Sequence, residues 1–167
     1  MIRLAVVDDA EALGRLHVRS WQVGYQEDFD SDFLAGLDAS ARVKWFKRVI
    51  GMATPVLVAD VDGDPVGFAM VGAARAGETD WGEVFSIYVH PDSWGQGHGF
   101  HLLVAAERAL ADDGFDHGLL WVLDSNIRAR RFYERQGWLL SRQIKLEHIG
   151  DVQVNEVRYE KDLRAPV

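Results

Sequence analysis

The residues with the clearest chemistry are three glycines in alternate positions, Gly95, Gly97 and Gly99. They follow a β-rich run over residues 83–89 and come just before a helical pattern that we expect over residues 99–113. Glycines let the backbone curl so that several N–H groups converge, and a helix N-terminus adds partial positive charge. The segment therefore indicates either an anion-binding loop suited to a pyrophosphate or a structural turn.

Two other phosphate-binding loops do not match this segment. A dinucleotide fingerprint has the pattern Gly-x-Gly-x-x-Gly, and here the third glycine comes one position early. A nucleoside-triphosphate loop ends in Gly-Lys-Ser/Thr, whereas this loop continues as Gly97-His98-Gly99. Both alternatives are rejected.

Two segments together resemble the acetyl-CoA signatures of the GNAT superfamily of N-acetyltransferases. In that family a strand ending in Val-x-Pro leads to a loop of pattern Arg/Gln-x-x-Gly-x-Gly/Ala. The matching positions of the first signature are Val89, Pro91, Trp94, Gly97 and Gly99, with Trp94 departing from the usual polar residue. The positions of the second signature, an asparagine that opens a helix, then Phe-Tyr and a Gly-aromatic pair, are Asn126, Phe132, Tyr133, Gly137 and Trp138.

The resemblance implies a binding site for acetyl-CoA and a leaving-group acid. Backbone N–H groups from Gly95 to Phe100 would hold the pyrophosphate, and the edge of the strand at residues 87–89 would pair with the pantetheine arm. Tyr133 would protonate the departing thiolate; it lies seven residues, about two helical turns, after Asn126 and so on the same helix face. The cofactor-binding residues implied are Ile87, Tyr88, Val89, Trp94, Gly95, Gln96, Gly97, His98, Gly99, Phe100, Asn126 and Arg128. Asn126 also suits a simple helix cap, and Tyr133 a core position.

Acetyl transfer to an amine also requires a base, because an alkylammonium has a pKa of about 10.4 and is charged at neutral pH. Glu83 opens the strand beside the expected thioester, where many relatives place an acidic base. An exposed strand-end carboxylate is the alternative reading of Glu83. His90 and His98 are the other candidates for the base.

The acceptor pocket is expected at the first helices, as is usual in the family. Trp21 and Tyr25 follow helical spacing together with His17 and Ser20, so they either line this pocket or belong to the core. The acidic residues 28, 30 and 32 attract a cationic acceptor or form a solvated loop.

The pattern of elements predicts an α+β domain with a mixed, mostly antiparallel sheet of about seven strands and about four helices. We expect a strand over residues 2–7, and a capping box of Asp8 and Glu11 that opens a helix ending near residue 25. Residues 29–50 look helical, with a break near 36–38. Turns at Asp62-Gly63-Asp64 and at residues 149–151 predict two hairpins. One acetyltransferase domain over 1–167 is expected, with an N-terminal part, 1–52, and an acetyl-CoA-binding part, 54–161.

The composition limits the partners. Eighteen Lys and Arg against 26 Asp and Glu give a net charge of −8, which disfavours nucleic-acid binding. Because the chain has no cysteine, disulfides and thiolate metal sites are excluded, and a cytoplasmic location is expected. The histidines lack the spacing of metal ligands, so no metal site is expected. No apolar run approaches the roughly 20 residues that cross a membrane.

The expected activity is transfer of acetyl from acetyl-CoA to a primary amine of a small molecule or peptide by direct attack in a ternary complex. A non-catalytic acyl-CoA-binding module is the alternative, and a homodimer is possible.

Overall fold

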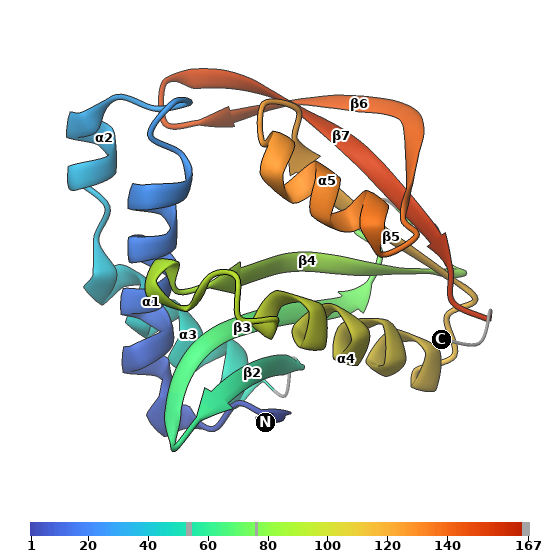
Figure 1. Cartoon of the computed structure of the whole chain (residues 1–167), viewed down its shortest axis with the longest axis horizontal. Helices are drawn as coiled ribbons and strands as arrows, with labels where there is room; N and C mark the ends of the chain where they lie inside the picture. The colour runs from blue at the N-terminus through green and yellow to red at the C-terminus, as the bar shows by residue number, and fades with distance from the viewer. Residues whose placement is uncertain (53–54, 76, 165–167) are drawn as a thin grey trace. The chain divides into compact units, whose positions relative to one another are not determined.

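The computed structural model describes residues 1–52, 55–75 and 77–164, which contain seven strands in one sheet (Figure 1). The strands are β1 (Ile2–Leu4), β2 (Val56–Val61), β3 (Asp64–Ala73), β4 (Trp81–Val89), β5 (His117–Leu123), β6 (Leu139–Ile149) and β7 (Val152–Asp162). Their order is β1-β2-β3-β4-β5-β7-β6. The β4–β5 pair is parallel, whereas β1–β2, β2–β3, β5–β7 and β6–β7 are antiparallel. The predicted mixed, mostly antiparallel sheet of an α+β domain is confirmed.

Five α-helices occur in the same part of the chain, one more than expected. They are α1 (Ala10–Gly24), α2 (Ser31–Ala35), α3 (Ala39–Gly51), α4 (His98–Asp112) and α5 (Ile127–Arg135). The break predicted near residues 36–38 separates α2 from α3. Asp38 opens α3 by accepting a hydrogen bond from the backbone N–H of Ser40 at 2.7 Å. Both hairpins predicted from their turn residues are present, β2–β3 and β6–β7.

The N-terminal segment differs from the prediction. Strand β1 stops at Leu4, and a 3-10 helix, Val7–Asp9, replaces the end of the expected strand. The capping box of Asp8 and Glu11 is wrong, because α1 begins after Asp9. The Asp9 carboxylate accepts hydrogen bonds from the Arg3 guanidinium, at 2.7 and 2.8 Å, and from the Val6 N–H at 2.8 Å. These contacts close the chain into a turn before α1 and leave Asp9 making no side-chain cap.

The chain divides into two compact units, and β3, β4 and α4 each contribute residues to both. The first unit comprises Met1–Val71 and Ser86–Ala106. It contains α1, α2, α3, β1, β2 and the glycine loop before α4. Its core is formed by fully buried side chains from helices and strands, namely Leu13, Phe46, Val58, Phe68, Leu102 and Leu103.

The second unit comprises Gly72–Phe85 and Glu107–Val167. It holds the first half of β4, the strands β5, β7 and β6, and helix α5. Its core is formed by Leu110, Leu119, Leu120, Trp138 and Tyr159, each at most 1% exposed. In Figure 1 the β6–β7 hairpin is the long orange-to-red ribbon.

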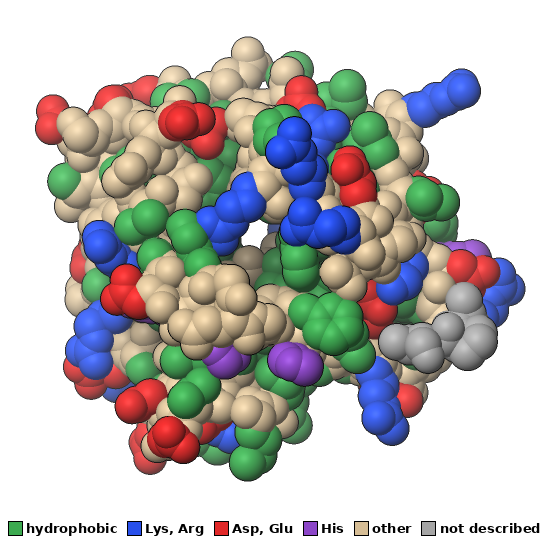
Figure 2. Space-filling model, viewed as in Figure 1, with side chains coloured by type: hydrophobic (Ala, Val, Ile, Leu, Met, Phe, Trp, Pro, Cys, Tyr) green, Lys and Arg blue, Asp and Glu red, His purple; other side chains and the backbone are tan. Residues whose placement is uncertain are grey.

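The surface carries charges of both signs. Figure 2 shows acidic and basic side chains interspersed over the visible face. Among the helices within 1–52, 55–75 and 77–164, none combines the length and apolar character needed to span a bilayer. The acidic residues that give the net charge of −8 are therefore mixed with basic ones. A helix that carries charges of one sign only departs from this general pattern.

Candidate functional site

The glycine loop has a backbone that only glycine adopts readily. Gly95 and Gly97 have φ angles of +76° and +85°, in the left-handed region. Within the described chain, the N–H groups of residues 95–97 donate no backbone hydrogen bond, and those of the first turn of α4 have no partner inside the helix. Residues 95–97 are exposed. The loop therefore presents a row of free N–H donors at the positive end of a 15-residue helix.

The Trp94 side chain anchors this loop to the end of β4 through a hydrogen bond. Its indole N–H donates to the carbonyl oxygen of Val89 at 2.7 Å, and the Ser20 hydroxyl of α1 donates to the same oxygen at 3.2 Å. His90, after the strand, accepts a hydrogen bond from the Asp92 N–H. The aromatic residue that departs from the family pattern thus has a positioning role in the loop.

Strand β4 has a partner on the β5 side over only part of its length. The parallel register runs from Trp81–His117 to Val84–Leu120. Beyond it, residues 121–123 of β5 continue in register with β7. The backbone of β4 after Val84, which includes Ile87 and Val89, lies outside the β5 ladder.

Helix α1 and β4 share an aromatic cluster in the first unit. The Trp21 indole N–H donates to the Tyr88 hydroxyl at 3.0 Å, and the Trp21 and Tyr25 ring centroids are 4.7 Å apart. The His17 ring meets the Tyr88 ring edge-on at 5.0 Å. Phe29 closes the cluster, 5.7 Å from Trp21. Trp21 and Tyr25 are thus half-buried members of an aromatic cluster.

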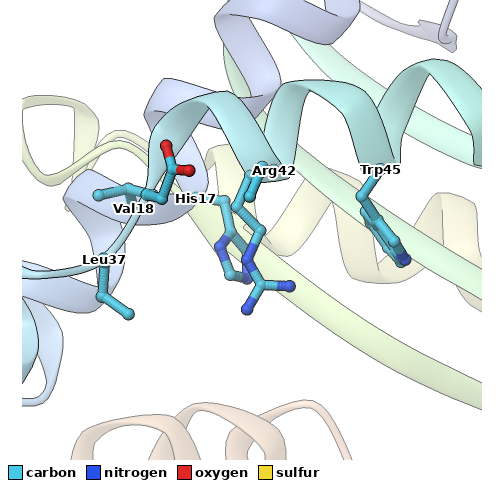
Figure 3. Close-up of a pocket in the computed structure, with 7 residues that line it drawn as sticks. His17, Val18, Leu37, Arg42 and Trp45 are labelled. Carbon is cyan, nitrogen blue, oxygen red and sulfur yellow. The ribbon is translucent and has the colours of Figure 1, made fainter.

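A cavity of about 290 Å³ lies between α1 and α3, next to this cluster (Figure 3). The residues that line it are His17, Val18, Leu37, Asp38, Ala41, Arg42 and Trp45. Figure 3 shows the His17 ring, the Arg42 guanidinium and the Trp45 indole pointing to the same side of α3. Of the residues predicted for the acceptor pocket, only His17 lines this cavity.

His17 is held neutral. Burial, with a smaller contribution from the nearby positive charge of Arg42, lowers the pKa of His17 to about 3. Its Nδ1 atom is buried and has no hydrogen-bond partner among the residues described. An unpaired buried nitrogen costs roughly 1–3 kcal/mol of stability.

In the second unit, Glu83 is neither exposed nor unpaired. It is 2% exposed, and its carboxylate accepts hydrogen bonds from the Arg75 backbone N–H at 3.1 Å and from the Arg75 Nε at 3.2 Å. The Arg75 guanidinium also lies over the Phe85 ring, 5.1 Å from its centroid. The alternative reading of Glu83 as an exposed strand-end carboxylate is therefore wrong; Glu83 is buried, and its carboxylate is paired with an arginine side chain that is 63% exposed.

Helix α5 carries the residues of the second signature. The Asn126 side chain accepts a hydrogen bond from the Ala129 N–H at 3.1 Å, as predicted for a helix cap. Tyr133 is 7% exposed, with ring centroids of Trp138 and Tyr159 at 6.4 and 6.2 Å. Arg128 lies on the exposed first turn of α5.

The predicted site residues thus fall into two groups. The first unit holds Trp21, Tyr25, Ile87, Tyr88, Val89, Trp94, Gly95, Gln96, Gly97, His98, Gly99 and Phe100. The second holds Glu83, Asn126, Arg128 and Tyr133. Arg42 and Trp45 were missed, although helix α3 has a sequence signal: four basic residues and no acidic one, in a chain of net charge −8.

Comparison with protein families gives a match to the acetyltransferase (GNAT) family over residues 11–138. The uncharacterized N-acetyltransferase YuaI of Bacillus subtilis is 31% identical over 128 residues, which cover 75% of this chain and 72% of that protein. An uncharacterized N-acetyltransferase of Archaeoglobus fulgidus is 31% identical over 144 residues, covering 81% of this chain and 90% of its own.

Solved structures share the fold. The PaiA N-acetyltransferase of Thermoplasma acidophilum, determined in complex with coenzyme A, superposes with a TM-score of 0.75 at 19% identity and covers 97% of this chain and 98% of its own. An N-acetyltransferase from Staphylococcus aureus gives a TM-score of 0.76 at 20% identity, with 98% coverage of both chains.

Proposed function

The chain belongs to the acetyltransferase (GNAT) family, and we propose that it transfers an acetyl group from acetyl-CoA to a primary amine of a small molecule or peptide. We take residues 1–167 to work as one catalytic domain. The observation that carries the proposal is the glycine loop, where left-handed backbone at Gly95 and Gly97 leaves consecutive N–H groups unpaired before α4. This donor set fits the pyrophosphate of acetyl-CoA, because backbone N–H groups at a helix N-terminus favour phosphate oxygens.

We propose that the pantetheine arm of acetyl-CoA lies along the end of β4. The backbone of β4 at Ile87 and Val89 lies beyond the β5 ladder, which supports pairing with the amide groups of the pantetheine arm. The Val89 carbonyl already accepts two hydrogen bonds, so we expect N–H and carbonyl groups nearer Ile87 to carry that pairing. We also propose Asn126 and Arg128, at the start of α5, as contacts of acetyl-CoA.

The reaction needs one base and one acid. The neutral amine nitrogen attacks the thioester carbonyl carbon, a nitrogen–carbon bond forms, the carbon–sulfur bond breaks, and the thiolate takes up a proton. We assign removal of the amine proton to Glu83, directly or through water, and donation to the thiolate to Tyr133. Because the Glu83 carboxylate is paired with the Arg75 guanidinium, its use as a base requires that side chain to turn away.

Calorimetric titration with acetyl-CoA tests the binding site. We expect one-to-one micromolar binding that Gly97→Val weakens at least about tenfold, because a β-branched side chain does not tolerate a φ of +85°. Gly63→Val is the matched control: Gly63, at the tip of the β2–β3 hairpin, has a φ of +95° and open space around it, so it suffers similar strain away from the loop. Equal loss of affinity in both variants, or no binding by the unmodified protein, would refute the loop assignment.

Acceptor-dependent release of the thiol tests the chemistry, and a chain with no cysteine gives no background with a thiol-reactive dye. Tyr133→Phe should lower kcat about 10²-fold or more while the affinity for acetyl-CoA stays unchanged. Glu83→Gln should also lower kcat. Normal turnover in either variant removes that residue from the mechanism.

A further inference from the structure

The cavity between α1 and α3 has features that the proposed reaction does not explain. Its lining includes the apolar groups of Val18, Leu37, Ala41 and Trp45. It also includes a cation, a neutral histidine and one carboxylate, from Arg42, His17 and Asp38. A small, mostly apolar cavity with a few converging polar groups is the usual form of a ligand site.

Arg42 is available to a ligand. Asp38 is four residues before Arg42, the spacing at which helical residues commonly pair. The Asp38 carboxylate is instead occupied with the start of α3, where it accepts from the Ser40 N–H at 2.7 Å and from the Ser40 hydroxyl at 3.1 Å. Within the ranges that the structure describes, Arg42 forms no ion pair, although it is half-buried. A half-buried guanidinium without a carboxylate suits an anionic ligand group.

The charge of α3 points to the same sign of ligand. The helix carries Arg42, Lys44, Lys47 and Arg48, and no Asp or Glu between Ala39 and Gly51. His17 adds no competing positive charge to the cavity, because its ring stays neutral. In a chain with an excess of eight negative charges, this helix is a local positive surface that attracts anions.

We propose that the α1–α3 cavity is the acceptor subsite for a carboxylate, so that the enzyme acetylates small amines that carry a carboxylate and an apolar body, the chemistry of an apolar amino acid. The Arg42 guanidinium binds the carboxylate, and Trp45, Val18 and Leu37 contact the apolar body. The volume of about 290 Å³ lies just below the usual range of ligand pockets, about 300–1,000 Å³, and so fits one small molecule. This inference rests on the proposed acetyl transfer, because it names the acceptor for it.

The test compares three amines with the same isobutyl side chain: L-leucine, its amide, and 3-methylbutylamine, which lacks the carboxylate carbon. Only leucine has the carboxylate. For each amine the thiol-release assay gives kcat/KM for the unmodified enzyme and for Arg42→Met, and their ratio cancels differences in amine reactivity. For leucine the ratio should be about 10 to 100, the size expected for losing a charged, bidentate contact. For the other two amines it should stay below about 3, and Arg42→Lys should restore part of the leucine activity.

Arg48→Met is the matched control, because Arg48 lies on the same helix at an exposed position and does not line the cavity. It removes the same charge and should leave all three ratios near one. Equal losses for the three amines in Arg42→Met, or equal losses in Arg48→Met, would overturn the proposal. A higher kcat/KM for 3-methylbutylamine than for leucine in the unmodified enzyme would also overturn the proposal.

A binding measurement separates this proposal from the function on which it rests. Leucine is titrated calorimetrically into the protein without acetyl-CoA, with the unfolding temperature of each variant checked first. Leucine binding that Arg42→Met abolishes, together with leucine turnover, supports the subsite. Turnover of 3-methylbutylamine without leucine binding overturns the subsite and leaves acetyl transfer intact. Absence of acetyl-CoA binding and of turnover with every amine refutes the proposed function itself.

Discussion

The two units differ in how their polar groups are satisfied. In the second unit, buried charges are paired: Glu107 accepts hydrogen bonds from Lys161 and Trp138, and Arg158, 2% exposed, binds Glu78 and Glu160. In the first unit the buried carboxylate of Asp9 is also paired, with Arg3, but the loop N–H donors and the guanidinium of Arg42 have no partner among the described residues. Paired groups stabilise a fold, whereas unpaired ones are positions at which a ligand is expected.

This difference indicates that the residues that bind ligands and the residues that stabilise the fold are largely different ones. The exceptions are the residues of the second unit to which chemistry is assigned. Glu83 is buried and paired like its neighbours, and Tyr133 is packed among Trp138 and Tyr159. Substitutions in the paired network should therefore change stability and leave ligand affinity alone, while substitutions around the α1–α3 cavity should change affinity as well.

The largest effect is expected from Lys161→Met. Lys161 donates to Glu107 at 2.8 and 2.9 Å and to the Gln136 carbonyl at 2.9 Å. Its loss leaves the carboxylate of Glu107, which is 3% exposed, with only the Trp138 indole as donor. Removing one partner of a buried pair costs about 3–5 kcal/mol of the free energy of unfolding. Urea denaturation measures this, and acetyl-CoA affinity at low temperature should not change.

An exposed ion pair provides the control for this prediction. Arg108 and Asp112 lie four residues apart on α4, and their side chains are 82% and 75% exposed. Arg108→Met should change stability by less than about 1 kcal/mol, since exposed pairs contribute little. The double variant Lys161→Met, Glu107→Gln should recover part of the loss, because no buried charge remains. A loss below 1 kcal/mol for Lys161→Met would show that the paired network is not a source of stability.

A medium effect is expected from Gly14→Ala, where α1 crosses α3. A Cβ atom at Gly14 would lie 2.6 Å from the Cγ2 of Val43 and 2.8 Å from its backbone nitrogen, so the helices must separate. Such overpacking costs about 1–3 kcal/mol, and it should weaken leucine binding in the cavity without changing acetyl-CoA affinity. Gly24→Ala is the control on the same helix, because a Cβ there meets nothing within 4 Å. Equal effects of the two substitutions on leucine binding would contradict this account of the cavity.

Features set by local chemistry were predictable from the sequence, and features set by packing between distant segments were not. Gly63 and Gly150 mark the two hairpins, and Asn126 caps α5, because turns and caps depend on a few adjacent residues. The capping box at Asp8 failed because Arg3, from the preceding strand, binds Asp9. Likewise, nothing local shows that Arg42 faces His17, since their proximity depends on how α1 packs against α3.

The smallest effect concerns pH and tests whether His17 is buried and neutral, as the cavity requires. Its pKa is about 3 in the folded chain and 6.5 ordinarily, and the charged groups that share the cavity are Arg42 and Asp38. Between pH 3 and pH 6.5 the unfolded chain binds a proton at His17 that the folded chain does not bind. The free energy of unfolding is therefore at its full value above pH 6.5 and falls as the pH falls. From pH 6.5 to 5.0 the loss reaches at most about 2 kcal/mol, at about 1.4 kcal/mol per pH unit. Urea denaturation at both pH values should show that His17→Gln removes this part of the loss, whereas His148→Gln, at an exposed position on β6, keeps it. Identical pH dependence in the unmodified protein and His17→Gln would mean that the ring takes up its proton in the folded state, which would place a positive charge beside Arg42 and change the electrostatics of the cavity.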